Sequence, residues 1–446
     1  NYLMIKITLN PSCMEEKKYI IDVILHHFLG IGDYSVCTDS KETGYTFELP
    51  NKNVLAFPDL FFLNEEKGSY LREEKLPKST EYRKCEFSVE KDIPVFFGDG
   101  SINRKKRGEK TSLFCNIDII ASIFFMLTRW EECLVSKKDK HGRVSAKSSV
   151  AHKFGFLKRP VVNEYIEMFW KLLTFLGYSG TRKAREYKII PTHDIDVINY
   201  PVDPKTIIGD LLKRQSFISF RKRLNARIKG INPFDSFGWI MDCVEKHNVQ
   251  ARFYFMNGGT SSFDKRYTVG NRFILDRIRE IASRNHIVGF HPSYSSFGDS
   301  EQWRYEKEEM ENALGFPVEY GRQHYLRFSV PDTWQVWDDN NMKEDQTVCF
   351  HDEPGFRCGT GDSFPVFNVK TKERLNLFET PLIVMDGTIA GYQKITDLTE
   401  IEEVFFYFKN TSEKYRMRYT ILFHNNRLSD YLFQKWTYLF EKLIKL

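Results

Sequence analysis

Several features are absent from this chain of 446 residues, and each absence excludes a class of protein. No run of about 18 apolar residues occurs, so we expect no transmembrane helix. The opening residues, NYLMIKITLN, lack the basic segment, apolar run and cleavage site of a secretory signal. Because the chain begins with Asn1 rather than Met, an export signal upstream stays open. No repeat or low-complexity tract is present, which argues against a solenoid or a disordered chain.

Closely spaced cysteine motifs and a strong net charge are also absent. None of the eight cysteines forms a Cys-x-x-Cys pair, so a thiolate zinc knuckle is not expected. We expect reduced thiols and a cytoplasmic protein, with disulfides as the alternative that the even count leaves open. The net charge of +5 is too small to indicate a nucleic-acid partner. Hydrophobic residues at 41% and charged residues at 28% are typical of a globular chain, and the length allows two or three domains.

Residues 1–182 predict an accessory α/β domain. A helix at about Asp118–Leu134 is apolar over most of its circumference and should be buried on several sides. A polar segment, Ser179–Tyr187, is interpreted as a linker to the rest of the chain. The other expected elements are a strand at Met4–Leu9 and helices at about Lys17–Phe28 and Val162–Leu176.

Residues 183–446 alternate between strand and helix patterns. This alternation predicts a parallel sheet or barrel with helices outside it. The expected strands are Lys188–Pro191, Ala251–Phe255, His286–Phe290, Ile383–Met385 and Tyr419–Phe423. The expected helices are at about Ser236–His247, Arg272–Ser283 and Leu398–Lys409.

Four of these strands end in ionisable residues. The first runs into His193-Asp194-Ile195-Asp196, and the others into His291, Asp386 and His424. In parallel α/β folds the chemistry gathers at the carboxyl ends of the strands. Carboxylates and imidazoles together are typical ligands of a divalent metal ion such as zinc. Each residue alone also has an ordinary structural explanation, such as a turn or helix cap for Asp386.

The Asp-x-Asp spacing suggests a division of labour. Residues i and i+2 of an extended segment point the same way, so Asp194 and Asp196 can face one cavity. A divalent ion would relieve their repulsion by binding one carboxylate, leaving the other to accept a proton from water. His424 could donate a proton to a leaving group.

The series HDID, ARFYFMNGG, GFHPSYSS, GRQHYLRF, PLIVMD and LFHNN resembles the motifs of the polysaccharide deacetylases, carbohydrate esterase family 4. The resemblance covers about Lys188–Leu446. The segments FFMLTRWEE, RPVVNEYIEMFW and GFRCGTGDSFP resemble signatures of a branch that is encoded with bacterial surface-polysaccharide genes and has an extra N-terminal domain. This resemblance implies a distorted (β/α) barrel and metal-dependent removal of an N-acetyl group from an amino sugar in capsule or O-antigen synthesis.

The resemblance also implies roles for individual residues. Asp194 matches the general base, Asp196 a metal ligand, and His291 the first histidine of the family's His-x-x-x-His motif. Arg322 matches the arginine that holds the base, and His424 matches the general acid.

The second motif histidine is replaced by Ser295, which leaves three interpretations of the metal site. His324 supplies the third ligand, which we slightly favour; Ser295 or water fills the position; or the site has decayed. His351 is a poorer candidate because its segment reads as a loop. Substrate contacts are expected from Asp386, Arg327, Tyr325 and Trp334, with Ser295 and His193 as further loop contributors. For Trp334, packing in the core is an equally good explanation.

Two other functions stay open at this point. A decayed metal site would leave a carbohydrate-binding or assembly protein without activity, and an intact one could act on another C–N bond, such as a formamide. The expected partner is an amino-sugar-containing saccharide, either polymeric or linked to a nucleotide or lipid. The sequence does not indicate the oligomeric state.

A basic insertion at about 200–233 interrupts the second half of the chain. Phe217 and Phe220 alternate with its basic residues, which are Lys205, Lys213, Arg214, Arg221, Lys222, Arg223, Arg227 and Lys229. One interpretation is a solvated helical face. The other is contact with the phosphate of a nucleotide-linked or lipid-linked sugar, or with an anionic membrane surface.

Overall fold

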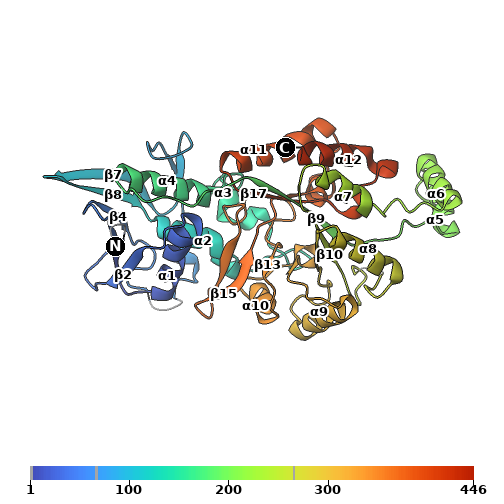
Figure 1. The fold of residues 1–446 in the computed structure, drawn as a ribbon, viewed down its shortest axis with the longest axis horizontal. Helices are drawn as coiled ribbons and strands as arrows, with labels where there is room; N and C mark the ends of the chain where they lie inside the picture. The colour runs from blue at the N-terminus through green and yellow to red at the C-terminus, as the bar shows by residue number, and fades with distance from the viewer. Residues whose placement is uncertain (1–3, 66–68, 265–266, 446) are drawn as a thin grey trace.

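The computed structural model describes residues 4–65, 69–264 and 267–445 (Figure 1). Figure 1 shows the N-terminal half at one end of the molecule and the second half at the other. Among the described residues, no helix combines the length and the apolar character needed to cross a bilayer. Cys115, Cys349 and Cys358 are buried free thiols.

A mixed six-stranded sheet organises the N-terminal half. In spatial order its strands are β2 (Tyr34–Thr38), β1 (Ile5–Leu9), β3 (Gly44–Glu48), β4 (Val54–Pro58), β8 (Lys110–Ile117) and β7 (Gly98–Arg107). A short pair, β5 (Glu81–Arg83) and β6 (Ile93–Val95), lies beside it. The helices are α1 (Met14–Asp22), which continues as a π-helical turn, α2 (Ile119–Thr128), α3 (Val150–Lys153) and α4 (Val161–Phe175).

Helix α2 is the centre of this half. All ten of its residues are buried, as its apolar circumference predicts. The Asp118 side chain caps its first turn by accepting from the Ala121 amide at 2.9 Å. The helix ends earlier than expected, because Arg129 adopts a left-handed conformation with φ 52°.

The second half is built on a nine-stranded sheet. In spatial order its strands are β14 (Phe364–Asn368), β15 (Glu373–Glu379), β13 (Glu344–Asp345), β12 (Tyr320–Gly321), β11 (Ile287–Phe290), β10 (Arg252–Phe255), β9 (Lys188–Ile195), β17 (Arg418–Leu422) and β16 (Val384–Met385). All neighbours are parallel except β14 and β15. The parallel α/β arrangement is therefore confirmed. The closed barrel is not, because the edge strands β14 and β16 do not pair with each other in the described part of the chain.

Helices follow most of these strands. They are α5 (Pro204–Leu212), α6 (Phe217–Lys229), α7 (Phe237–Glu245), α8 (Arg272–Ser283), α9 (Ser300–Leu314), α10 (Asp332–Asp339), α11 (Leu398–Lys414) and α12 (Asp430–Ile444). Helix α8 shows why they form: Ile274, Ile278 and Ile281 recur at helical spacing and are fully buried.

The two halves share one hydrophobic core, which runs through both sheets. The Arg357 guanidinium of the second half donates to the Glu132 carboxylate of the first at 2.5 Å, and both side chains are buried. The Tyr19 hydroxyl donates to the Pro365 carbonyl at 2.7 Å. A division of the chain near residue 182 stays a prediction.

Candidate active site

The carboxyl ends of the parallel strands bring the predicted ionisable residues together. One cavity of about 440 Å³ is lined by Asp194 and Asp196 from the end of β9, His291 after β11, His324 after β12 and His424 after β17. This is the position at which parallel α/β folds carry their chemistry.

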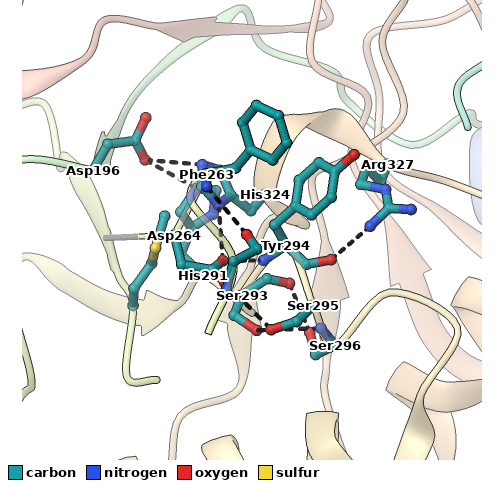
Figure 2. Close-up of polar contacts among 12 residues, drawn as sticks. Asp196, Phe263, Asp264, His291, Ser293, Tyr294, Ser295, Ser296, His324 and Arg327 are labelled. Carbon is teal, nitrogen blue, oxygen red and sulfur yellow. Dashed lines mark hydrogen bonds and ion pairs between the residues drawn. The ribbon is translucent and has the colours of Figure 1, made fainter. Parts of the chain in front are cut away.

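Three of these side chains form a compact group of metal-ligand type. Nε2 of His291 lies 3.3 Å from Oδ1 of Asp196, and Nε2 of His324 lies 3.8 Å from the same oxygen. One ligand atom from each residue falls within 4.8 Å of the others. Figure 2 shows Asp196 facing both imidazoles.

The orientation and the ionisation of these side chains are compatible with binding of a divalent ion. Nδ1–H of His291 donates to the Arg322 carbonyl at 2.6 Å, so that Nε2 is the nitrogen that faces Asp196. This Nε2 and Oδ1 of Asp196 are buried and accept no hydrogen bond. Burial alone would raise the pKa of Asp196, but His324, His291 and His424 outweigh it and lower that pKa. One carboxylate and two imidazoles are a common ligand set for catalytic zinc.

A strained turn holds His324 at this position. The two residues after it have left-handed backbones, Tyr325 with φ 61° and Leu326 with φ 52°. Nη1 of Arg143 donates to the Tyr325 carbonyl at 2.9 Å and so holds the turn from the N-terminal half. Burial lowers the pKa of His324 to about 4, which keeps its imidazole neutral, as metal binding requires.

Ser295 does not belong to the ligand group. Its hydroxyl lies 3.1 Å from that of Ser293 and donates to Asp264 at 3.3 Å. In Figure 2 it lies with the neighbouring serines, away from Asp196. His351 pairs with Asp139 at 3.5 Å and is not part of the group either. Among the described residues, His324 is therefore the side chain that accompanies Asp196 and His291.

A buried arginine holds Asp194. Nη1 of Arg322 donates to Oδ1 of Asp194 at 2.7 Å, and its Nε donates to the Gln346 carbonyl at 2.8 Å. Arg322 is completely buried, so this charge-assisted bond fixes the carboxylate in place. Oδ2 of Asp194 lies 3.9 Å from Nε2 of His291, beside the ligand group.

A buried aspartate holds His424 in the same way. Oδ1 of Asp386 accepts from Nδ1 of His424 at 2.6 Å, and Oδ2 accepts from the His424 amide at 2.9 Å. Burial would lower the pKa of His424, but Asp386 and the site aspartates raise it to about 9. Nε2 therefore carries a proton at neutral pH, and it lies 3.6 Å from Oδ2 of Asp196.

Four expected contributors lie elsewhere. Asp386 is fully buried and serves His424 rather than the cavity. Trp334 is also buried, and its indole donates to Glu379 at 2.9 Å. Arg327 donates to the His141 and Tyr294 carbonyls and stacks on the Tyr294 ring. His193 is a buried residue of β9, with Nδ1 donating to the Phe423 carbonyl at 2.8 Å. We therefore replace the expected substrate contacts of these four side chains with contacts inside the protein. Tyr325, by contrast, does line the cavity.

Several lining residues were not anticipated. Asn426 and Arg427 follow His424 directly, so closeness to the last motif was the signal that could have found them. No such signal exists for Arg143, which reaches the cavity from the N-terminal half. The remaining lining residues include Phe234, Tyr392 and Phe433.

Comparison with known proteins gives limited similarity. Residues 5–177 match the model of a family of unknown function (DUF7033). No curated protein matches the chain. Among solved structures, the chain is similar to a putative polysaccharide deacetylase from Mycobacterium smegmatis, with TM-score 0.40, 13% identity, and coverage of 59% of this chain and 84% of that one. A probable polysaccharide deacetylase from Pseudomonas aeruginosa PAO1 matches with TM-score 0.36, 10% identity, and coverage of 60% and 89%. The chitin deacetylase of Colletotrichum lindemuthianum matches with TM-score 0.26, 13% identity, and coverage of 53% and 86%.

Proposed function

We propose that the protein is a metal-dependent hydrolase that removes the N-acetyl group of an amino sugar. One observation carries this proposal: the Asp196–His291–His324 group lies between a carboxylate held by Arg322 and a protonated imidazole held by Asp386. A ligand set, a base and an acid around one cavity are the components of amide hydrolysis.

The residues divide the reaction between them. A divalent ion held by Asp196, His291 and His324 would polarise the acetyl carbonyl and lower the pKa of water. Asp194 accepts the proton of the attacking water, and Arg322 keeps its carboxylate oriented. The water oxygen bonds to the carbonyl carbon and the C–N bond breaks. His424 gives its Nε2 proton to the departing nitrogen, so acetate and a free amine leave.

The cavity suits a sugar residue. Its volume of about 440 Å³ lies in the range of small-molecule sites. Tyr325, Tyr392 and Phe234 supply aromatic surface, and Arg427 supplies hydrogen-bond donors. The motif resemblance supports zinc as the metal, a distorted barrel and a role in capsule or O-antigen synthesis as parts of the same proposal. The cytoplasmic location stays a prediction.

Acetate release tests this function. The zinc-loaded protein is incubated with N-acetylated amino sugars, free and nucleotide-linked, and acetate is measured. We expect turnover that a chelator abolishes and zinc restores. Asp194→Asn should lower kcat by about 10²–10⁴-fold while retaining the metal. Asp276→Asn, an exposed carboxylate on α8, is the matched control and should leave kcat unchanged.

Other results would select other functions. Formate release without acetate would indicate a different C–N hydrolase. Sugar binding that is unchanged in Asp194→Asn, with no bound metal and no turnover, would indicate a binding protein and overturn the proposal.

A further inference from the structure

Helices α5 and α6 form a hairpin that stands apart from the body of the molecule (Figure 1). The two helices pack against each other, with Ile207 and Ala226 buried between them. The hairpin contacts the body where the Tyr431 hydroxyl donates to the Lys222 carbonyl at 2.7 Å. Most of its surface therefore faces solvent.

The end of the hairpin carries large apolar side chains that no other part of the described chain covers. On α5, Ile208, Leu211 and Leu212 follow one another at helical spacing with exposures of 52%, 38% and 75%. Phe217 and Ile218 open α6 with exposures of 65% and 71%. Large exposed apolar side chains gathered in one short segment indicate an interaction site.

Positive charge is spread along the whole hairpin, from Lys213 beside the apolar tip to Lys205, Arg227 and Lys229 at the opposite ends of the two helices. Residues 200–233 contain eight basic residues and two aspartates, a net charge of +6, whereas the whole chain carries +5. Both aspartates lie away from the apolar tip or are already paired. Asp203 caps α5 by accepting from the Thr206 amide, and the buried Asp210 pairs with Arg214 and Arg223. Lys205, Lys213, Arg221, Arg227 and Lys229 are left exposed.

The hairpin also lies beside the candidate active site. Phe234 follows the end of α6 and lines the cavity. Phe433, two residues beyond the contact at Tyr431, also lines the cavity and is 39% exposed. The side of the hairpin that contacts the body therefore lies close to the cavity, and its apolar tip lies at the other end of α6.

We propose that the α5–α6 hairpin docks the protein on a membrane surface containing anionic phospholipid. Aliphatic and aromatic side chains at the tip would enter the interfacial region, while Lys213, Arg221 and the other basic side chains along the hairpin contact lipid phosphates. Nucleic acid fits this surface less well, because its bases stack on aromatic rings and do not bury leucine and isoleucine. This docking does not depend on the proposed deacetylase activity.

Vesicle co-sedimentation tests the docking. The full-length protein is mixed with phosphatidylcholine vesicles, or with vesicles in which about one quarter of the lipid is phosphatidylglycerol, at about 0.15 M salt. We expect binding to the anionic vesicles only. Neutralising one basic side chain near an anionic lipid surface lowers the binding constant about fivefold. The double variant Lys213→Gln/Arg221→Gln should therefore bind roughly 25-fold more weakly. Leu212→Ser/Ile218→Ser should lose at least about tenfold.

Matched variants elsewhere separate the hairpin from general surface effects. Lys105→Gln/Arg107→Gln removes charge from the exposed β7 segment, and Leu60→Ser removes a leucine that is 52% exposed. Both should bind vesicles like the wild type. All variants should keep the wild-type melting temperature and acetate release, which separates this result from the proposed function.

Three outcomes would overturn the docking. These are no binding to either vesicle, equal binding to both, and unchanged binding of both tip variants. Self-association that the tip variants abolish, without vesicle binding, would assign the surface to a second copy of the chain. Binding of single-stranded nucleic acid in place of vesicles would assign it to that ligand.

Discussion

At the residue scale, the position of His324 decides what kind of site this is. Two ligands hold a catalytic zinc ion weakly, and three are usual. The sequence alone left the third ligand open, because the motif position is occupied by Ser295. The turn at Tyr325 and Leu326 brings His324 to within 3.8 Å of Asp196, whereas Ser295 bonds to Ser293 and Asp264.

Metal retention distinguishes these two residues. His324→Ala should release the metal. Replacing a residue that only orients a metal ligand lowers metal affinity by about 10–100-fold, and loss of the ligand itself should lower it further. Ser295→Ala should retain about one ion per chain. Metal content is measured by mass spectrometry after dialysis against a weak chelator. His351→Ala, a buried histidine paired with Asp139, serves as the control and should also retain the metal. Release from Ser295→Ala but not from His324→Ala would reverse the assignment.

Trp334 and Arg327 show why a side chain of a given type does not by itself indicate substrate contact. Substrate contact is the expectation for Arg327, and for Trp334 the sequence is compatible with both a sugar subsite and core packing. The same side chains also suit packing: Trp334 donates to the buried Glu379, and Arg327 donates to two backbone carbonyls. Only the three-dimensional partners distinguish the two roles.

At the element scale, strands β13 and β15 place two carboxyl groups opposite each other. Asp345 and Glu379 are directly paired in the sheet, and both are completely buried. Burial raises the pKa of both groups. The folded state therefore holds protons that the unfolded chain releases above about pH 4.

The contribution of these two carboxyl groups to the stability should consequently fall as the pH rises. A carboxyl group with a raised pKa in the folded state contributes its full stability below its unfolded pKa and loses it as the pH rises through the folded pKa. Asp345→Asn removes one of these groups and should make the free energy of unfolding less dependent on pH, by on the order of 2 kcal/mol between about pH 5 and pH 8. Urea denaturation at several pH values measures this. The exposed Asp332→Asn is the control. Parallel curves for Asp345→Asn and the wild type would contradict the expectation.

Local patterns predicted most elements and few of their ends. Helix α8 occupies the expected residues 272–283, because its apolar spacing and its Asn271 cap agree. Helix α2 stops at Thr128 rather than near Leu134, because Arg129 leaves the helix and pairs with Glu131 and Glu132. In the sequence alone, Arg129, Glu131 and Glu132 are equally compatible with a continuing helix. Strand β9 extends through the His-Asp-Ile motif to Ile195, because β10 and β17 pair with it on both sides.

At the scale of the whole molecule, the N-terminal half takes part in building the candidate site. Asp139, His141 and Arg143 reach across to the second half. Nδ1 of His141 lies 3.1 Å from the Tyr294 hydroxyl, and Nη2 of Arg143 donates to the Tyr392 hydroxyl at 2.7 Å. No sequence pattern predicts such contacts, because their partners lie more than a hundred residues apart in the chain.

Arg143 should therefore act as a positioning residue. Its replacement by alanine removes the bonds to the Tyr325 carbonyl and the Tyr392 hydroxyl, and so loosens both the turn that carries His324 and one wall of the cavity. We expect Arg143→Ala to lower metal affinity and kcat/KM by about 10–100-fold, the usual effect of losing a residue that orients a metal ligand.

The matched control for Arg143 is Arg159, a partly buried arginine of the N-terminal half that pairs with Asp92 and Glu164 away from the cavity. Arg159→Ala should lower the melting temperature while metal affinity and KM stay as in the wild type. Metal titration and steady-state acetate release are measured for both variants below their melting temperatures. If Arg143→Ala loses as much stability as Arg159→Ala and its metal affinity is unchanged, this arginine only packs the two halves together. A selective loss of metal affinity in Arg143→Ala would show that the N-terminal half completes the site.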